Sequence, residues 1–159
     1  MPDEQLVRSA VDGELDVRKV LDAEITRMLA DDRSRTLGSS FASQWLGFND
    51  LGRVRPGPID NPWCTDTLIE SMKDESALFF WSLVQSNAPI EDVLTADYTY
   101  LNEELANHYR MKSVRGEKMR RVSLEGTPRG GILGHGSILA ITSFPGRTSP
   151  VLRGNWILS

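Results

Sequence analysis

Residues 65–86 read TDTLIESMKDESALFFWSLVQS and carry the longest helical pattern in the chain. We expect Thr65 to cap this helix, because a Thr hydroxyl accepts a hydrogen bond from the free N–H groups of the first turn. The first turn is polar, whereas the later turns are apolar almost all round. A helix that is apolar on every side is buried. The stretch therefore predicts the central helix of a helical bundle.

Two amphipathic helices are predicted before this central helix. Residues 14–31 and about 34–49 both place apolar side chains three and four positions apart. The loop 52–62, GRVRPGPIDNP, must end the second helix because proline lacks the backbone N–H that a helix needs. A further helix is predicted over residues 99–109, where apolar residues recur every four positions. After Tyr109 the pattern changes, and the weak alternation of apolar and basic residues over 114–124 suggests a loop and a short strand.

The C-terminal part is glycine-rich. Five glycines fall within residues 126–136, and a short apolar run follows at residues 137–142. Ser149 and Pro150 suit the N-cap and first position of a last helix. We expect a mostly α fold: a bundle of four to five helices with an irregular Gly-rich C-terminal segment.

The domain organisation follows from this change in pattern. We predict a helical domain over residues 14–125 and a Gly-rich segment over residues 126–159 that packs on it. The segment carries too many large apolar residues to be a free tail: Ile132, Leu133, Ile138, Leu139, Ile141, Val151, Leu152, Trp156 and Ile157. If the segment does not pack on the bundle, a homodimer through it is the alternative.

Composition excludes several classes of protein. The chain has 159 residues, 40% hydrophobic and 25% charged, which is typical of a globular domain and not of a disordered one. It contains no apolar run long enough for a transmembrane helix, and residues 1–20 do not read as a secretory signal. The lone Cys64 excludes an internal disulfide and a multi-cysteine zinc site.

Charge is unevenly distributed along the chain. Residues 1–104 carry a net charge of −11 and residues 105–159 a net charge of +7. The basic tract over residues 110–129 suits either docking on acidic surfaces, in this chain or a neighbouring domain, or binding of an anion or nucleic acid. Only Tyr109 brings an aromatic ring to the tract, and stacking platforms for bases need aromatic rings. Nucleic acid is therefore the less favoured partner.

Three stretches together resemble a known family. They are FASQWLG (41–47), ADYTYLNEELANHY (96–109), and RGGILGHGS (129–137) with TSPVLRGNWIL (148–158). The pattern resembles large secreted proteins of planctomycetes that contain domain of unknown function 1592 followed by domain 1588. Many members carry a c-type haem motif, C-x-x-C-H, in flanking domains. Here Cys64 is followed by Thr65 and Asp66, so this chain lacks a haem attachment site and no cofactor is expected.

The resemblance implies a non-catalytic helical module of a larger extracytoplasmic, cytochrome-associated protein. The alternative is a small glycosidase that uses two helix-borne carboxylates about 5–9.5 Å apart. The candidate catalytic residues are Glu75, Glu70, Asp97 and Glu104. Glu75 is the most interesting, because its apolar neighbours along the helix are expected to raise its pKa. A polysaccharide or a neighbouring domain is the expected partner.

Three smaller groups of residues suggest binding. Arg147, Arg153 and Ser149 surround the start of the last helix, where they suit either an anion or an ion pair with Asp97 or Glu104. Glu104 and His108 lie one helical turn apart, as a surface pair or two metal ligands, but no third ligand is evident and no metal is expected. Trp63 is expected to be exposed for sugar stacking, and Trp45 and Trp81 to lie in the core. Gly-His135-Gly-Ser137 is not the nucleophile motif of serine hydrolases.

Overall fold

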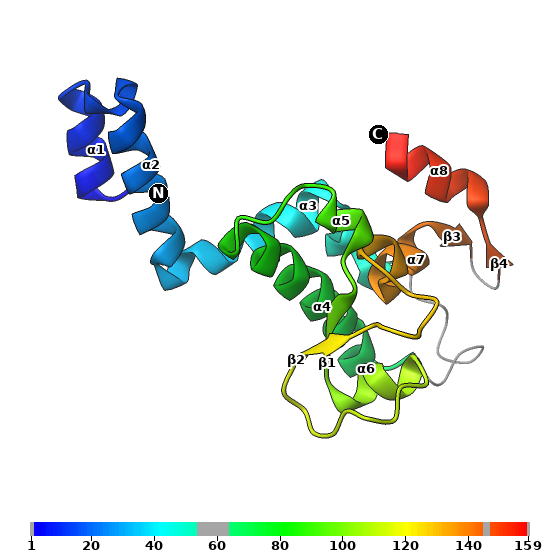
Figure 1. Ribbon diagram of the computed structural model, residues 1–159. Coiled ribbons are helices and arrows are strands. Elements are labelled where there is room, and N and C mark those ends of the chain that lie inside the picture. Colours follow the sequence, from blue (N-terminus) through cyan, green and yellow to red (C-terminus); the bar gives the residue numbers. More distant parts are fainter. Residues whose placement is uncertain (1, 54–63, 145–146, 159) are drawn as a thin grey trace. The chain divides into compact units, whose positions relative to one another are not determined.

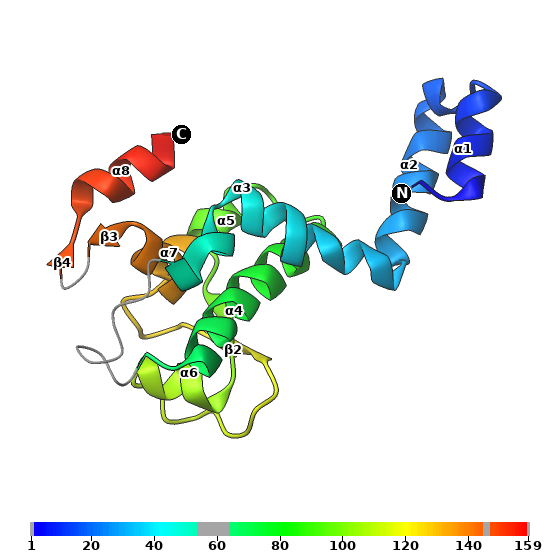
Figure 2. The same ribbon diagram turned by 180° about the vertical axis from the view of Figure 1, so that it is seen from behind.

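The computed structural model describes residues 2–53, 64–144 and 147–158. The chain forms two compact units, Met1–Arg35 and Thr36–Ser159, called unit 1 and unit 2 below and described separately. The described residues are mostly helical, with two small two-stranded sheets (Figures 1 and 2). The predicted fold class is thus confirmed. Across these ranges no helix combines the length and hydropathy that a membrane span requires.

Unit 1 is a pair of helices joined by a short turn. Helix α1 (Glu4–Val11) is followed by the 3₁₀ turn η1 (Glu14–Asp16), helix α2 (Arg18–Ala30) and the 3₁₀ turn η2 (Asp32–Arg35). The backbone N–H of Leu6 donates to the Asp3 carboxylate at 2.9 Å, which caps α1. The helix predicted over 14–31 is therefore α2 with a 3₁₀ turn before it, because Val17 is extended and separates the two.

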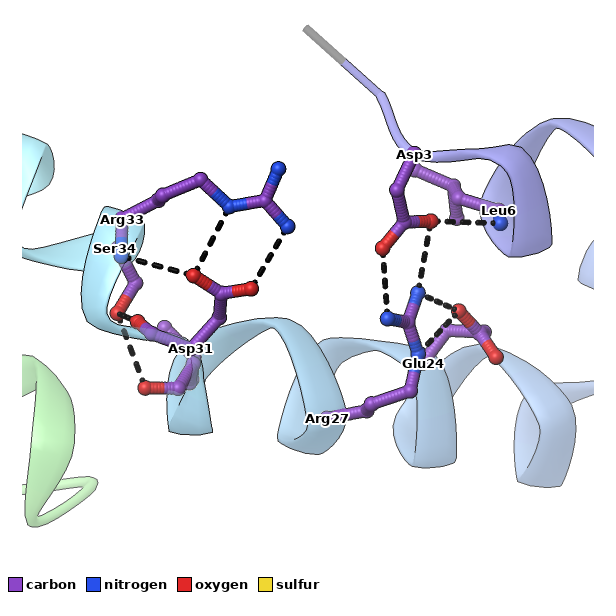
Figure 3. A network of polar contacts seen from close by, with 8 residues as sticks. Asp3, Leu6, Glu24, Arg27, Asp31, Arg33 and Ser34 are labelled. Atoms are coloured by element: carbon purple, nitrogen blue, oxygen red, sulfur yellow. Dashed lines mark hydrogen bonds and ion pairs between the residues drawn. The ribbon is translucent and has the colours of Figure 1, made fainter.

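A salt-bridge network joins the two helices of unit 1 (Figure 3). The Arg27 guanidinium, on α2, donates to the Asp3 carboxylate at 2.6 Å and to the Glu24 carboxylate at 2.6 Å. These hydrogen bonds from Arg27 hold the pKa of Asp3 at about 2 and lower that of Glu24. Gln5, on α1, also donates to Glu24 at 2.6 Å. The network fixes the start of α1 beside the middle of α2.

Helix α4 (Asp66–Gln85) is the centre of unit 2, as predicted. The Leu68 N–H donates to the Thr65 hydroxyl at 3.0 Å, so the expected cap is present. Several elements pack against α4 (Figures 1 and 2). They include the π-helix η3 (Leu37–Ala42), strand β1 (Tyr98–Leu101), helix α6 (Glu103–His108) and helix α7 (Gly136–Ile141). The core lies between them and includes fully buried Phe48, Leu51, Phe79, Leu101, Leu105, Ile132 and Ile138.

One predicted helix is divided into shorter helical pieces in the structure. The helix predicted over 34–49 is η3, the helical turn α3 (Ser43–Trp45) and the 3₁₀ helix η4 (Phe48–Arg53). The apolar run at 137–142 belongs mostly to α7. The loop predicted at 52–62 falls largely outside the described residues. The short helical turn α5 (Asp92–Thr95) precedes β1.

The helix predicted over 99–109 was wrong in its first half. Strand β1 pairs antiparallel with β2 (Arg120–Ser123), with Thr99 opposite Val122. Tyr-Thr-Tyr favours a strand, since β-branched and aromatic side chains fit a pleated surface. Asn102 then caps α6, because its side-chain oxygen accepts from the Leu105 N–H at 2.9 Å. The apolar spacing is shared by the strand and the helix and does not distinguish them.

The C-terminal segment packs into unit 2. Ile132, in the 3₁₀ turn η5 (Ile132–Gly134), is 1% exposed, and Ile138 is fully buried. The hairpin β3 (Ser143–Phe144) and β4 (Arg147–Thr148) leads to helix α8 (Pro150–Leu158). The Leu152 N–H donates to the Ser149 hydroxyl at 3.2 Å, so the predicted helix start is confirmed. The Trp156 indole N–H donates to the Leu46 carbonyl at 2.9 Å.

Candidate functional site

The only carboxylate that α4 carries into the core of unit 2, among the described residues, is that of Glu75. Glu75 lies on the buried face of the helix between Met72 and Phe79 and is 1% exposed. Its two oxygens have separate partners. The Tyr109 hydroxyl donates to Oε2 at 2.5 Å, and the Thr99 hydroxyl donates to Oε1 at 2.7 Å. Tyr109 follows α6 and Thr99 lies on β1, so three elements meet at this carboxyl group.

A second set of polar groups surrounds the buried His135 ring. The Ser76 hydroxyl lies 3.0 Å from Nδ1, and the Thr99 hydroxyl lies 3.4 Å from Nε2. Ser76 also contacts the Ser137 hydroxyl at 2.6 Å. The Phe79 ring packs against the imidazole edge to face at 4.8 Å between centroids. His135 is thus held on three sides within the core.

Tyr109 joins these groups to the start of α7. The Gly136 N–H donates to the Tyr109 hydroxyl at 2.6 Å, and the Arg129 guanidinium lies 3.7 Å above the Tyr109 ring. We call the six side chains that these contacts connect the buried polar network. Its members are Glu75, Ser76, Thr99, Tyr109, His135 and Ser137. Each of them is at most 8% exposed.

Burial sets the protonation of the network. It raises the pKa of Glu75 to about 7, although the hydrogen bonds from Tyr109 and Thr99 act in the opposite direction. Burial, and secondarily the positive charge of Arg129, lowers the pKa of His135 to about 3. Burial also raises the pKa of the Tyr109 phenol well above its usual range. Near neutral pH, His135 and Tyr109 are therefore uncharged, and Glu75 is the one member poised to gain or lose a proton.

One arrangement of hydrogens satisfies every contact when Glu75 is ionised. Ser137 donates to Ser76, Ser76 donates to Nδ1 of a neutral His135, and Nε2–H donates toward Thr99. Thr99 and Tyr109 then both donate to the carboxylate, because an ionised carboxylate can only accept. The donors form a chain that ends on Glu75. Such a chain strengthens each of its bonds, because every hydroxyl polarises the next.

The predicted catalytic residues occupy different environments. Glu75 has the burial and the raised pKa that its neighbours predict. Glu70 is exposed on another face of α4 and bonds Lys73 at 2.9 Å, and Asp97 is exposed just before β1. Glu104, on α6, accepts from the Thr65 and Thr67 hydroxyls at 2.7 and 2.9 Å. The partners that the structure gives to Glu75 are hydroxyl groups, and none of the three other candidates is among them.

The predicted anion site has other contacts. Ser149 caps α8, the Arg153 Nε donates to the Thr142 hydroxyl at 3.4 Å, and Arg147 lies 5.0 Å above the Phe144 ring. Among the described residues, the contacts of these two side chains lie within the same C-terminal segment. The ion pair with Asp97 or Glu104, the alternative to an anion, is not among them.

The basic tract is engaged largely by its own unit. Arg115 forms an ion pair with Glu103 at 2.8 Å, and Arg121 lies 3.7 Å above the Tyr98 ring. Together with Arg129 on Tyr109, these contacts favour the interpretation that the tract docks on the helical part of the chain. No three His, Cys, Asp or Glu side chains gather as a metal site would need, as far as the described ranges extend. Glu104 and His108 therefore lack a third ligand there.

The tryptophans separate into different environments. Trp81 is 9% exposed, as predicted for the core, whereas Trp45 is 58% exposed. The prediction for Trp45 was wrong, because the apolar spacing of residues 34–49 does not say which apolar side chains other elements cover. Trp63, the predicted sugar-stacking residue, lies outside the described residues.

Sequence reasoning identified Glu75 but missed its partners. Ser76, Thr99 and Tyr109 gave no motif, and His135 with Ser137 matched no hydrolase pattern. The available signal was the pair Glu75-Ser76 in the middle of an apolar helix, since buried polar groups need hydrogen-bond partners. Those partners come from residues 24 to 61 positions further along the chain, as the contacts Glu75–Thr99 and Ser76–Ser137 illustrate.

Comparison with protein families identifies a similarity over most of the chain. A family model described as "PSD4: Protein of unknown function (DUF1592)" matches residues 1–111. The matched part contains Glu75, Ser76, Thr99 and Tyr109, and it ends before His135 and Ser137. No curated protein and no solved structure matches the chain.

Proposed function

Because the chain belongs to the family of proteins of unknown function DUF1592, we propose that it is a non-catalytic helical module of a larger, extracytoplasmic, cytochrome-associated protein. The cytochrome association and the extracytoplasmic location rest on the sequence pattern of residues 41–158. The similarity of residues 129–158 to the start of domain 1588 belongs to the same proposal.

The burial of the network is the observation that supports a non-catalytic role. A general acid or base must come within hydrogen-bond reach of a substrate atom. Glu75 and His135, whose pKa values are strongly shifted, are each 1% exposed and are hydrogen-bonded within the core. Satisfied polar networks of this kind make a core unique and rigid. We infer that the network holds α4, β1, α6 and α7 together.

The alternative is a small glycosidase, and one observation favours it. A pKa of about 7 for Glu75 suits a general acid at neutral pH. That mechanism also needs a second carboxylate and a path for the sugar to reach both. Glu70, Asp97 and Glu104 remain the candidates for the second carboxylate, each with its own separate contacts.

A turnover assay distinguishes the module from the glycosidase. The purified chain is incubated with soluble neutral and acidic polysaccharides, and new reducing ends are measured. We expect the wild-type chain and the Glu75→Gln variant to release equally little product. Product release by the wild type that Glu75→Gln abolishes would contradict the module and support the glycosidase.

A neighbouring domain with c-type haem is the proposed partner. Helix α8 exposes three apolar side chains, Val151 at 81%, Ile157 at 53% and Leu158 at 88%, which suit contact with such a domain. The chain is expected to co-elute with a c-type cytochrome domain taken from a family member, detected by haem absorbance. A Val151→Ser, Leu158→Ser variant should lose co-elution, whereas Val11→Ser, an equally exposed valine of unit 1, should not. Self-association of the chain that the same double variant removes would instead support the homodimer.

A further inference from the structure

Three aromatic rings gather on the surface of unit 2. Phe41, Trp45 and Phe80 come from η3, α3 and α4, and their centroids are separated by 5.9, 6.1 and 6.0 Å. Phe41 is 53% exposed and Trp45 is 58% exposed, whereas Phe80 is half-buried. We call these three residues the aromatic surface.

A close approach between two helices creates the aromatic surface. Gly38, in η3, is buried against α4, where an added Cβ would lie 2.3 Å from the Ala77 carbonyl oxygen. Only a glycine lets the two backbones come this close. Phe80 stands three residues after Ala77 on α4 and so reaches the rings of Phe41 and Trp45. The π-helical turn that carries Phe41 is a rare conformation that occurs frequently at functional sites.

The chemistry of the surroundings indicates the ligand. Residues 37–47 read LGSSFASQWLG and contain no charged residue, although a quarter of the chain is charged. Ser39, Ser40 and Gln44 are exposed beside the aromatic rings along this stretch. A pyranose ring has an apolar C–H face that stacks on aromatic rings, and hydroxyl groups at its edge that bond hydroxyl and amide side chains. This uncharged stretch with its hydroxyl and amide side chains matches a neutral sugar, and the stretch itself brings no charge to pair with a uronate or phosphate.

We propose that the aromatic surface binds a neutral polysaccharide. Phe41 and Trp45 supply the stacking faces, and Phe80 packs against both rings. The side chains of Gln44, Ser39 and Ser40 supply hydrogen bonds. Phe48 and Phe79 of the same unit, by contrast, are at most 1% exposed. Binding at this surface requires no catalytic residue and is independent of the function proposed above.

Affinity electrophoresis of the full chain in gels containing a neutral soluble β-glucan tests the proposal. Wild type should be retarded, and Trp45→Ala should weaken the apparent affinity by about tenfold, the effect expected when one stacking aromatic is removed. Phe144→Ala is the matched control, because Phe144 is 47% exposed on β3 of the same unit. That variant should migrate like the wild type. Equal unfolding temperatures of the two variants exclude a loss of the fold as the cause.

Several results would overturn the proposal. One is the absence of retardation by neutral polysaccharides for the wild type, and another is unchanged retardation of Trp45→Ala. Binding only to an acidic polysaccharide, weakened by salt, would assign recognition to the basic tract. Sedimentation measures whether the surface is instead an interface between two copies. That outcome requires a dimeric wild type, a monomeric Trp45→Ala variant and no effect of glucan on either. The turnover assay is unaffected by any of these outcomes.

Discussion

Glu75→Gln is expected to gain stability relative to the wild type as the pH rises from 4.5 to 8. The carboxyl group ionises at about 4.5 in the unfolded chain, whereas in the fold it keeps its proton up to about 7. Between these values the unfolded state releases a proton that the folded state retains, so each rise in pH favours unfolding of the wild type. Glutamine stays neutral. Between pH 4.5 and 8 the unfolding free energy of Glu75→Gln should therefore rise by about 3 kcal/mol relative to that of the wild type.

Urea unfolding at several pH values measures this difference. Glu70→Gln is the matched control, since it makes the same chemical change on the exposed face of the same helix. That side chain is exposed and contacts Lys73, so Glu70→Gln lacks the burial on which the expected pH dependence of Glu75→Gln rests. A difference for Glu75→Gln that does not change between pH 4.5 and 8 would contradict the burial of an ionising carboxyl group.

His135 has the opposite dependence on pH. Its pKa falls from 6.5 in the unfolded chain to about 3 in the fold. The unfolded state therefore binds a proton that the folded state does not, and stability is lost as the pH falls from about 6.5 to 3. From pH 4.5 to 6.5 the contributions of Glu75 and His135 have opposite signs and offset each other. The contribution of the network to stability is thus least sensitive to pH between about 4.5 and 6.5.

Local signals in the sequence predicted the local structure well. Thr65 and Ser149 were expected to begin helices, and both accept a hydrogen bond from the first turn of the helix that follows. Capping depends only on residues within one turn, so the sequence contains the whole signal. Strand β1 was missed for the opposite reason. Thr99 pairs with Val122, a partner 23 positions away that no local pattern reveals.

The same distinction applies to the candidate site. The neighbours that bury Glu75 lie three and four residues away on α4, so its raised pKa could be predicted. The hydroxyls that bond it come from Thr99 and Tyr109, on elements whose packing the sequence does not give. Trp45 shows the complementary error. Its helical spacing predicted burial, but exposure depends on whether another element covers that face.

Removal of residues 130–159 is expected to unfold unit 2. The segment supplies Ile132 and Ile138 to the core, His135 and Ser137 to the buried polar network, and the Gly136 N–H to Tyr109. Without it, the hydroxyls of Ser76 and Tyr109 lose partners, and each buried group left without a partner costs about 1–3 kcal/mol. Such losses compare with a total stability of roughly 5–15 kcal/mol for a domain. The truncated chain should lose its cooperative thermal transition or aggregate.

Two point variants separate the role of packing from the loss of chain length. Ile138→Ala removes a fully buried side chain of α7 and should cost about 2–5 kcal/mol. Val151→Ala shortens a side chain of α8 that is 81% exposed, and it should change the unfolding temperature little. Calorimetry of the two variants beside the truncated chain measures both effects. A truncated chain that stays monomeric and melts like the wild type would show that the C-terminal segment does not hold the core together, because its buried isoleucines would then contribute no stability.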